Sequence, residues 1–372
     1  MILRIILLVP SQKNRHSVIN NIFDDLCLAL DAIEVQWERV IVNTPGLKCD
    51  DYEKKVKTIE GNDIEKYIKS NSKMETIFVT IDDFYITKML YGRKEKANLL
   101  IWANYFYGHR FIFRRYNEID RLFPISFFNR LLRKISELIP IFILSAISRK
   151  YHGTLAKANV VSQSIWTDLL LERVYSIKTK GILPIPVNKD FLPINVQERK
   201  SKLLLFLGNY DETDLSSLYN TIRAVEGVMN IESIDYFGTE ETGKIFQQHF
   251  HVELKYVGKI SRDELSMCYR SHFLTICPIF NGNFEMVPVE SLMSGTPVIS
   301  FIQPFMEITG YSPMVANILN ISEIRSKTLL WKKLDNEIRE KERNRILDVM
   351  DSRKVAEQLV KYANEIIEKD ID

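Results

Sequence analysis

Residues 283–300 read NFEMVPVESLMSGTPVIS and carry more information on the fold than any other segment. A loop at the start leads into an apolar helix, which Gly295 and Pro297 end before the chain returns as a buried strand. The N–H groups of the loop and of the helix N-terminus form a positive pole suited to phosphate. Glu290, expected in the first helical turn, can accept hydrogen bonds from vicinal hydroxyls such as those of a ribose. An ordinary strand–loop–helix with an acid in its first turn explains the same residues, so both interpretations stay open.

Short apolar runs alternate with helical patterns on both sides of this stretch. The expected strands are residues 3–9, 35–42, 76–81, 98–103, 160–162, 181–185, 203–207, 233–237, 254–257, 273–277 and 297–301. The expected helices are residues 17–30, 216–225, 262–270 and 290–294, with a charged helical tail at 326–371. Strands separated by helices imply crossover connections, so we expect an α/β protein with mainly parallel sheets.

A proline-rich segment separates two halves of similar size. Residues 183–193 read LPIPVNKDFLP, and repeated prolines break regular structure. The 372 residues suffice for two domains of roughly 100–200 residues each. We therefore expect domains at 1–190 and 191–350, followed by a C-terminal helix at 351–372. Open parallel sheets bind ligands beyond the carboxyl ends of their strands, so a cleft between two Rossmann-like domains is the expected site.

The composition is that of a globular protein, with 46% hydrophobic and 26% charged residues, which excludes a disordered or fibrous chain. The 50 basic and 48 acidic residues give a net charge of +2, so we expect no nucleic acid partner. The cysteines lie far apart and form no C-x-x-C pair: Cys27, Cys49, Cys268 and Cys277. This spacing argues against a disulfide scaffold or a zinc site.

The N-terminal apolar run indicates a buried strand rather than a signal peptide. Arg4 interrupts the run, the run is short, and no small-residue cleavage site follows it. No stretch of the sequence reaches the roughly 20 continuous apolar residues of a membrane span. Together with the cysteine usage, these features lead us to expect a cytoplasmic protein.

Several segments follow one another in an order that is typical of a known family. Residues 256–270 form a strand, a glycine turn and a helix just before the stretch 283–300. Further segments of this kind are residues 14–18, 158–167, 181–188, 203–209 and 235–239. Taken in order, they resemble family 4 glycosyltransferases of GT-B fold, in which the counterpart of 283–300 is the donor-binding signature. The resemblance covers about residues 1–30 and 155–365 of the chain.

This resemblance implies two Rossmann-like domains that face a cleft, with the C-terminal helix packing back on the N-terminal domain. It also implies a hexosyltransferase-type enzyme that moves a sugar from a nucleotide-diphosphate sugar to an acceptor with retention of configuration. The N-terminal domain would bind the acceptor and the C-terminal domain the donor. No cofactor and no obligatory metal are expected. Positioned backbone donors and bases would stabilise the charge that develops on the leaving nucleotide diphosphate.

The resemblance assigns donor-site roles to particular residues. Glu290 would hold the donor ribose, and Met286 and Val287 with their neighbouring backbone would face the diphosphate. Asn283 and Glu285 are the candidates for recognition of the sugar, and Glu285 is also a candidate catalytic residue.

The chain departs from the family pattern at three places. Gly282 stands where the family has a first glutamate, Gly208-Asn209 where it commonly has Gly-Arg, and Asp214 where it has a lysine. Lys259 and Arg262 are the bases that would take over contact with the diphosphate. These departures keep open a non-catalytic sugar- or nucleotide-binding protein on the same fold. A third interpretation, a sugar-nucleotide epimerase of related fold, predicts product without an added acceptor.

Three residues of the first half are candidates for the acceptor side. His109 and Asn104 lie in the loop after an expected strand, and His16 lies at the start of the first expected helix. His109 is also a candidate catalytic residue. A solvent-facing or structurally hydrogen-bonded histidine explains His16 and His109 as well, so both interpretations stay open.

Residues 110–147 (Arg110 to Ile147) combine arginines with phenylalanines and end in the apolar run 138–147. Such a mixture can place an amphipathic helix at an anionic membrane surface, as a peripheral protein of the inner face. That interpretation suits a lipid-linked acceptor, whereas a sugar or a protein acceptor needs no membrane. The alternative is a core helix at 131–147 with a solvated rim of arginines.

Overall fold

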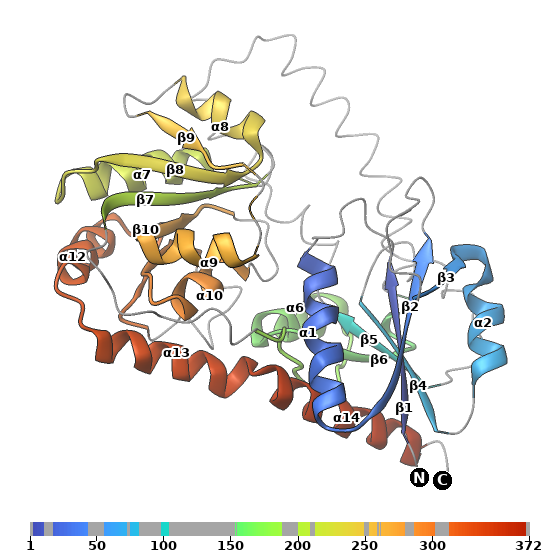
Figure 1. Cartoon of the computed structure of the whole chain (residues 1–372). Coiled ribbons are helices and arrows are strands. Elements are labelled where there is room, and N and C mark those ends of the chain that lie inside the picture. The colour runs from blue at the N-terminus through green and yellow to red at the C-terminus, as the bar shows by residue number, and fades with distance from the viewer. Residues whose placement is uncertain are drawn as a thin grey trace. The chain divides into compact units, whose positions relative to one another are not determined.

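The computed structural model describes residues 3–10, 18–43, 56–72, 75–81, 98–103, 153, 155–187, 200–208, 213–248, 253–258, 260, 262–279, 286–301 and 312–369. These residues form two compact units, each built on a parallel sheet (Figure 1). The first unit takes in the described residues up to 103, those from 153 to 187 and those from 350 onwards. The second unit takes in the described residues from 200 to 349.

The sheet of the first unit has the strand order β3-β2-β1-β4-β5-β6, with parallel pairing throughout. Its strands are β1 (Arg4–Pro10), β2 (Gln36–Asn43), β3 (Lys57–Glu60), β4 (Thr76–Ile81), β5 (Leu99–Ala103) and β6 (Asn159–Ser162). The helices of this unit are α1 (Val18–Ala32), α2 (Ile64–Asn71), α6 (Ile165–Tyr175) and α14 (Ser352–Lys369). Residues 5–9 of β1 are fully buried, because a central parallel strand is covered on both faces.

Helix α14 belongs to the first unit, although it follows the whole of the second unit in sequence. It packs along α1 (Figure 1), and a backbone bridge joins Val187 to Asp351 just before α14 begins. Val355, Leu359 and Ala363 are buried at a spacing of one helical turn, so one apolar face of α14 points inward. The expectation that this helix packs back on the N-terminal domain is confirmed.

The sheet of the second unit has the order β12-β11-β10-β7-β8-β9, again with parallel pairing throughout. Its strands are β7 (Lys200–Leu207), β8 (Ser233–Gly238), β9 (Leu254–Tyr256), β10 (His272–Cys277), β11 (Val298–Ser300) and β12 (Val315–Asn317). Its helices are α7 (Leu215–Glu226), α8 (Glu240–Gln247), α9 (Arg262–Ser271), α10 (Met286–Met293), α12 (Ile321–Trp331) and α13 (Asn336–Met350).

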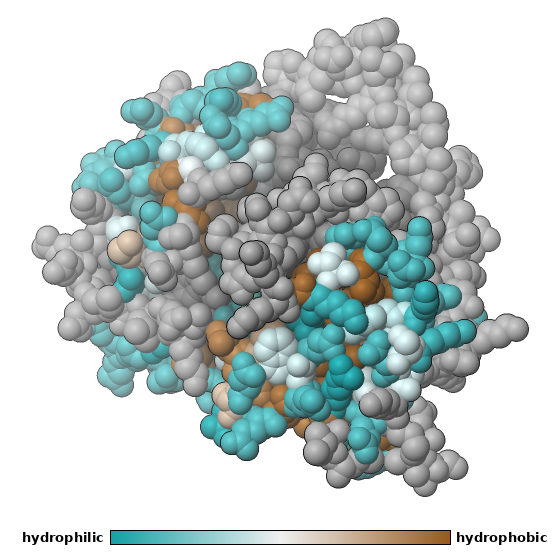
Figure 2. Space-filling model, turned by 45° about the vertical axis from the view of Figure 1, so that its right-hand side comes forward, coloured by the Kyte–Doolittle hydropathy of each residue, from teal (hydrophilic) through white to brown (hydrophobic). Residues whose placement is uncertain are grey.

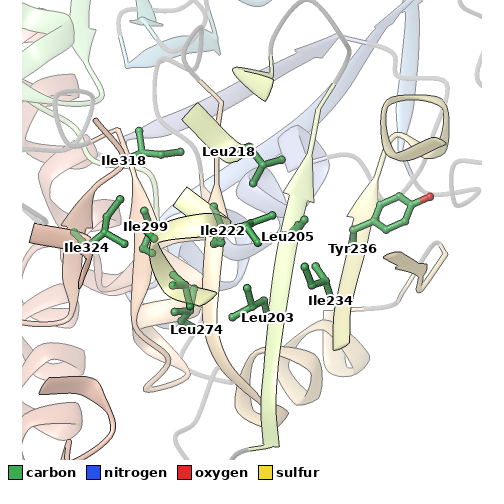
Figure 3. Packing of buried hydrophobic residues seen from close by; sticks show 14 of the residues in the cluster. Leu203, Leu205, Leu218, Ile222, Ile234, Tyr236, Leu274, Ile299, Ile318 and Ile324 are labelled. Carbon is green, nitrogen blue, oxygen red and sulfur yellow. The ribbon is translucent and has the colours of Figure 1, made fainter. Parts of the chain in front are cut away.

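One apolar core of the second unit lies between its sheet and helices α7 and α12. The strand residues in this core include Leu203, Leu205, Ile234, Leu274 and Ile299 (Figure 3). They pack with Leu218 and Ile222 of α7 and Ile324 of α12 (Figure 3). Leu203 and Leu205 are two positions apart on β7 and so point to the same face of the sheet. This packing holds α7 in place and thereby sets where its N-terminus lies.

The described residues on the face drawn in Figure 2 are mainly hydrophilic. On the face drawn in Figure 2, hydrophobic residues form small separate areas among hydrophilic ones. Of the large exposed apolar side chains, Leu28 (67% exposed) and Met267 (55%) stand alone in the sequence, whereas Leu329 and Leu330 are adjacent. Exposed apolar side chains of this kind are normal for a globular protein. Within the described part of the chain, no helix combines the length and the apolar character that crossing a membrane requires.

The prediction of a strand at residues 181–185 is wrong. This segment makes only an isolated bridge, between Ser162 and Ile182. The N–H groups of Lys180 and Leu183 bond to the end of β6, but Pro184 and Pro186 have no N–H to continue a ladder.

The helix expected at 290–294 begins earlier, at Met286, so Glu290 lies in its second turn rather than its first. Pro288 lies in the first turn of the helix, where proline is tolerated because N–H groups there have no intrahelical acceptor. Gly295 ends the helix as expected, with a φ of 69° in the left-handed region that favours glycine.

Candidate functional site

The two central strands of the second sheet, β7 and β10, are neighbours, and each leads to a helix, α7 and α10 respectively. From β7 the sheet continues through β8 and β9 on one side, whereas β10, β11 and β12 lie on the other side. Such a change of direction is a topological switch point, and open α/β sheets bind ligands beyond the carboxyl ends of the strands there. The ends of β7 and β10 therefore mark the candidate site.

Backbone contacts join the two chain segments that follow these strands. The N–H of Asp214 donates to the carbonyl oxygen of Pro278 at 2.8 Å, and Thr213 pairs with Ile279 in an antiparallel bridge. Thr213 is fully buried. Because these segments are tied together, the start of α7 is held next to the chain that leaves β10.

Asp214 is the N-cap of α7. Its carboxylate accepts the N–H of Ser217 at 3.0 Å and the hydroxyl of Ser217 at 2.8 Å. An acid at this position stabilises the helix by satisfying a terminal N–H and by its interaction with the helix dipole. A negative charge therefore stands at the start of α7, at the position where the family resemblance has a lysine.

Glu290 lies in the second turn of α10 and is partly buried. It accepts a hydrogen bond from α9, the helix that precedes α10 in the sequence. The hydroxyl of Tyr269, in the last turn of α9, donates to Oε2 of Glu290 at 3.1 Å. Burial, and then the negative charge of Glu290, raise the pKa of Tyr269 well above its ordinary value. The hydroxyl therefore keeps its proton and acts as a donor to the carboxylate.

Met286 and Val287 begin α10, and their side chains are 8% and 7% exposed. The side chains therefore serve the core, and what these residues can offer a ligand is their backbone N–H groups at the helix N-terminus. Gly208 follows β7 directly, and its carbonyl oxygen accepts the hydroxyl of Thr242 in α8 at 2.9 Å. This contact ties the end of β7 to the neighbouring helix.

The other predicted site residues are not placed by the structure. Those outside the described residues are Asn209, Lys259, Asn283, Glu285, His16, Asn104 and His109. Arg262 is the first residue of α9, and its side chain is not among those that the structure describes. The basic and aromatic segment 110–147 also lies outside the described residues. Of the predicted donor-site residues, the structure thus places Gly208, Met286, Val287 and Glu290 in the second unit.

Sequence reasoning missed Tyr269. The segment 256–270 that contains it was matched to the family as a strand, a turn and a helix, without a role for this side chain. A tyrosine on the apolar face of a helix normally indicates core packing, and nothing local in the sequence shows that its hydroxyl meets Glu290. Among the described residues, no group of three or more His, Cys, Asp or Glu side chains is placed to hold a metal ion.

The sequence matches no protein-family model and no curated protein. The structure, in contrast, has the fold of known GT-B glycosyltransferases, with two parallel six-stranded sheets and their helices. The α/β GT-B fold that the resemblance implied is therefore confirmed.

Three solved structures illustrate this similarity. Sucrose-phosphate synthase from Thermosynechococcus elongatus matches with a TM-score of 0.69 over 98% of this chain and 100% of that one, at 12% identity. A glycosyltransferase from Rickettsia africae ESF-5 matches with a TM-score of 0.65 over 98% of each chain, at 13% identity. WaaG, a glycosyltransferase involved in lipopolysaccharide biosynthesis, matches with a TM-score of 0.64 over 97% of this chain and 99% of that one, at 10% identity.

Proposed function

We propose that this chain is a glycosyltransferase that moves a sugar from a nucleotide-diphosphate sugar to an acceptor. The observation that carries the proposal is Glu290, held on α10 in the second unit, with the start of α10 following the switch point of a GT-B sheet. The glycosyltransferases that share the fold support the same reaction class. The second unit would bind the donor and the first unit the acceptor.

The described residues have distinct tasks in this proposal. The Glu290 carboxylate accepts hydrogen bonds from the donor ribose, because an ionised carboxylate is an acceptor only. The N-terminal N–H groups of α10 stabilise the negative charge that develops on the leaving diphosphate. Lys259 and Arg262 would add positive charge there, and Asn283 and Glu285 would contact the sugar. The resemblance to family 4 implies retention of configuration and no need for a metal. It also implies an acceptor that is a sugar, a lipid-linked molecule or a protein.

One observation favours a second candidate function, a non-catalytic nucleotide- or sugar-binding protein. Asp214 caps α7 where the family resemblance has a lysine, so this end of the site carries an acid in place of a base. A negative charge next to a diphosphate weakens the stabilisation of a leaving group. Turnover separates the two functions, because only the enzyme releases sugar from the donor.

The first experiment is a thermal unfolding series with UDP-, GDP- and ADP-linked sugars and the free diphosphates. A ligand at a hundredfold excess over its Kd stabilises the native state by about 2.7 kcal/mol, a rise in Tm of about 5–10 °C for a unit of this size. We expect one nucleotide to produce this rise and Glu290→Ala to lower its affinity about tenfold or more, because a hydrogen bond to a charged group is lost.

The matched control is Glu226→Gln, which changes a glutamate at the far end of α7, paired there with Arg223. This variant is expected to keep the full ligand response. A wild-type protein that responds to no nucleotide would overturn the proposed function. A clear response without release of sugar to water or to any added acceptor would instead support the non-catalytic function.

A further inference from the structure

Tyr269 joins two helices of the second unit through its side chain. It lies in the last turn of α9 and is fully buried, and its hydroxyl donates to Oε2 of Glu290 on α10 at 3.1 Å. The two residues are 21 positions apart in the sequence, and the strand β10 lies between α9 and α10 along the chain. The contact therefore exists only because the two helices pack against each other.

Both ends of Tyr269 are held in place. Its ring meets the ring of Phe237 edge-on, with centroids 6.3 Å apart and an angle of 82° between the planes. Its carbonyl oxygen accepts the hydroxyl of Thr296, fully buried in the turn after α10, at 2.6 Å. Edge-to-face ring pairs and buried hydrogen bonds each favour one orientation of the side chain. The Tyr269 hydroxyl is thus a fixed donor rather than one that searches for a partner.

We propose that Tyr269 is a positioning residue for the donor site, whose hydroxyl orients the Glu290 carboxylate to receive the two hydroxyls of a ribose. The inference rests on the proposed function and extends it from the reaction class to the recognition of the sugar ring of the nucleotide. A carboxylate that is oriented before binding loses less side-chain freedom when the ligand arrives. The consequence is a preference for ribonucleotides over 2′-deoxyribonucleotides that depends on Tyr269.

The test is Tyr269→Phe, which removes the hydroxyl but keeps the ring beside Phe237 and the backbone acceptor of Thr296. The probes are UDP, GDP and ADP with their 2′-deoxy counterparts, and the measurement is the Kd by calorimetry. The matched control is Tyr362→Phe, which removes a mostly buried tyrosine hydroxyl of the first unit, bonded to the carbonyl of Ile182 at 3.2 Å. Circular dichroism and thermal unfolding show whether each variant folds.

We expect Tyr269→Phe to weaken binding of the preferred ribonucleotide about 3- to 10-fold and binding of its 2′-deoxy counterpart much less. Tyr362→Phe leaves both affinities at the wild-type level. In the background of Glu290→Ala, removal of the Tyr269 hydroxyl causes no further loss, because residues that act through one another are not additive. The double variant also tests the inference by itself, because a further loss of affinity relative to Glu290→Ala would show that Tyr269 does not act through this carboxylate.

Two results would overturn the inference while leaving the proposed function intact. One is a wild-type preference for the ribonucleotide that Tyr269→Phe does not change. The other is an equal loss for the ribo and deoxy ligands, which would show a general structural role. A wild-type protein that binds none of the nucleotides would overturn the proposed function and, with it, this inference.

Discussion

At the scale of single residues, Asp235 and His272 form a buried ionisable pair. Nε2 of His272 lies 3.0 Å from Oδ2 of Asp235, and Nδ1 lies 2.6 Å from the carbonyl oxygen of Cys268. The side chain of His272 is thus held between a carboxylate of β8 and a backbone carbonyl of α9. The hydrogen bond from His272 lowers the pKa of Asp235 below its ordinary value of 3.8, against the opposing effect of burial.

This pair predicts an acid-dependent loss of stability. Because the pKa of Asp235 is lower in the folded than in the unfolded chain, its stabilising effect is complete above pH 3.8 and is lost as the pH falls through the folded value. Asp235→Asn should therefore cost about 2 kcal/mol at pH 7 and should unfold with a shallower acid dependence than the wild type. Urea unfolding from pH 3 to 7 measures both quantities.

The control for this prediction is Asp63→Asn, an exposed aspartate that makes no side-chain hydrogen bond as the cap of α2. It should leave the free energy of unfolding within about 0.5 kcal/mol of the wild type. An Asp235→Asn variant with the wild-type acid dependence would show that the pair contributes nothing to stability.

At the scale of elements, the start of α7 combines a stabilising role with an electrostatic one. Asp214→Asn should keep the cap, because asparagine caps helices as well as aspartate does, whereas Asp214→Ala should lower the free energy of unfolding by about 1 kcal/mol. Both variants remove a negative charge beside the proposed diphosphate position. We expect each to bind the preferred nucleoside diphosphate about 2- to 5-fold more tightly.

Unfolding in urea and calorimetric titration separate these two effects. Raised ionic strength should shrink the gain in affinity only slightly, because Asp214 is buried (6% exposed) and salt screens buried charges much less than exposed ones. Weaker binding by Asp214→Asn would mean that the carboxylate receives a hydrogen bond from the ligand. In that case Asp214 would be a binding residue rather than a source of repulsion.

At the scale of the whole molecule, the chain crosses from the second unit back to the first. Leu359 is fully buried on α14, the helix that packs along α1. Leu359→Ala should destabilise the first unit by about 2–5 kcal/mol through the cavity it leaves. Hydrogen exchange should show faster exchange in β1, while β7, whose core lies in the second unit, keeps its protection.

Leu329→Ala serves as the comparison, because this leucine of α12 is 50% exposed. Its effect on the free energy of unfolding should stay within about 0.5 kcal/mol. An equal loss of protection in β1 and β7 after Leu359→Ala would contradict the prediction and show that the two units unfold as one.

Short exposed elements were beyond the reach of pattern analysis. The strand β3 is mostly exposed and two of its four residues are charged, so it lacks the apolar run or alternation that marks a strand. The strand β12 has only three residues. Helix α8 carries three charged residues in eight, so the sequence pattern does not show its small buried face. The charged tail was expected as one helical region, but it consists of α12, α13 and α14. Helix α12 belongs to the second unit and α14 to the first.

The apolar runs of the sequence determined the described strands of both sheets other than β3 and β12, and with them the two-part α/β organisation. The physical reason is that parallel strands covered on both faces must be apolar along their length. The sequence also singled out Glu290 and the glycine that ends its helix. Only the tertiary structure decided that Tyr269 bonds to Glu290 and that Asp214 is tied to the chain after β10. These contacts join residues far apart in the sequence, and their partners meet only once the strand order of the sheet is formed.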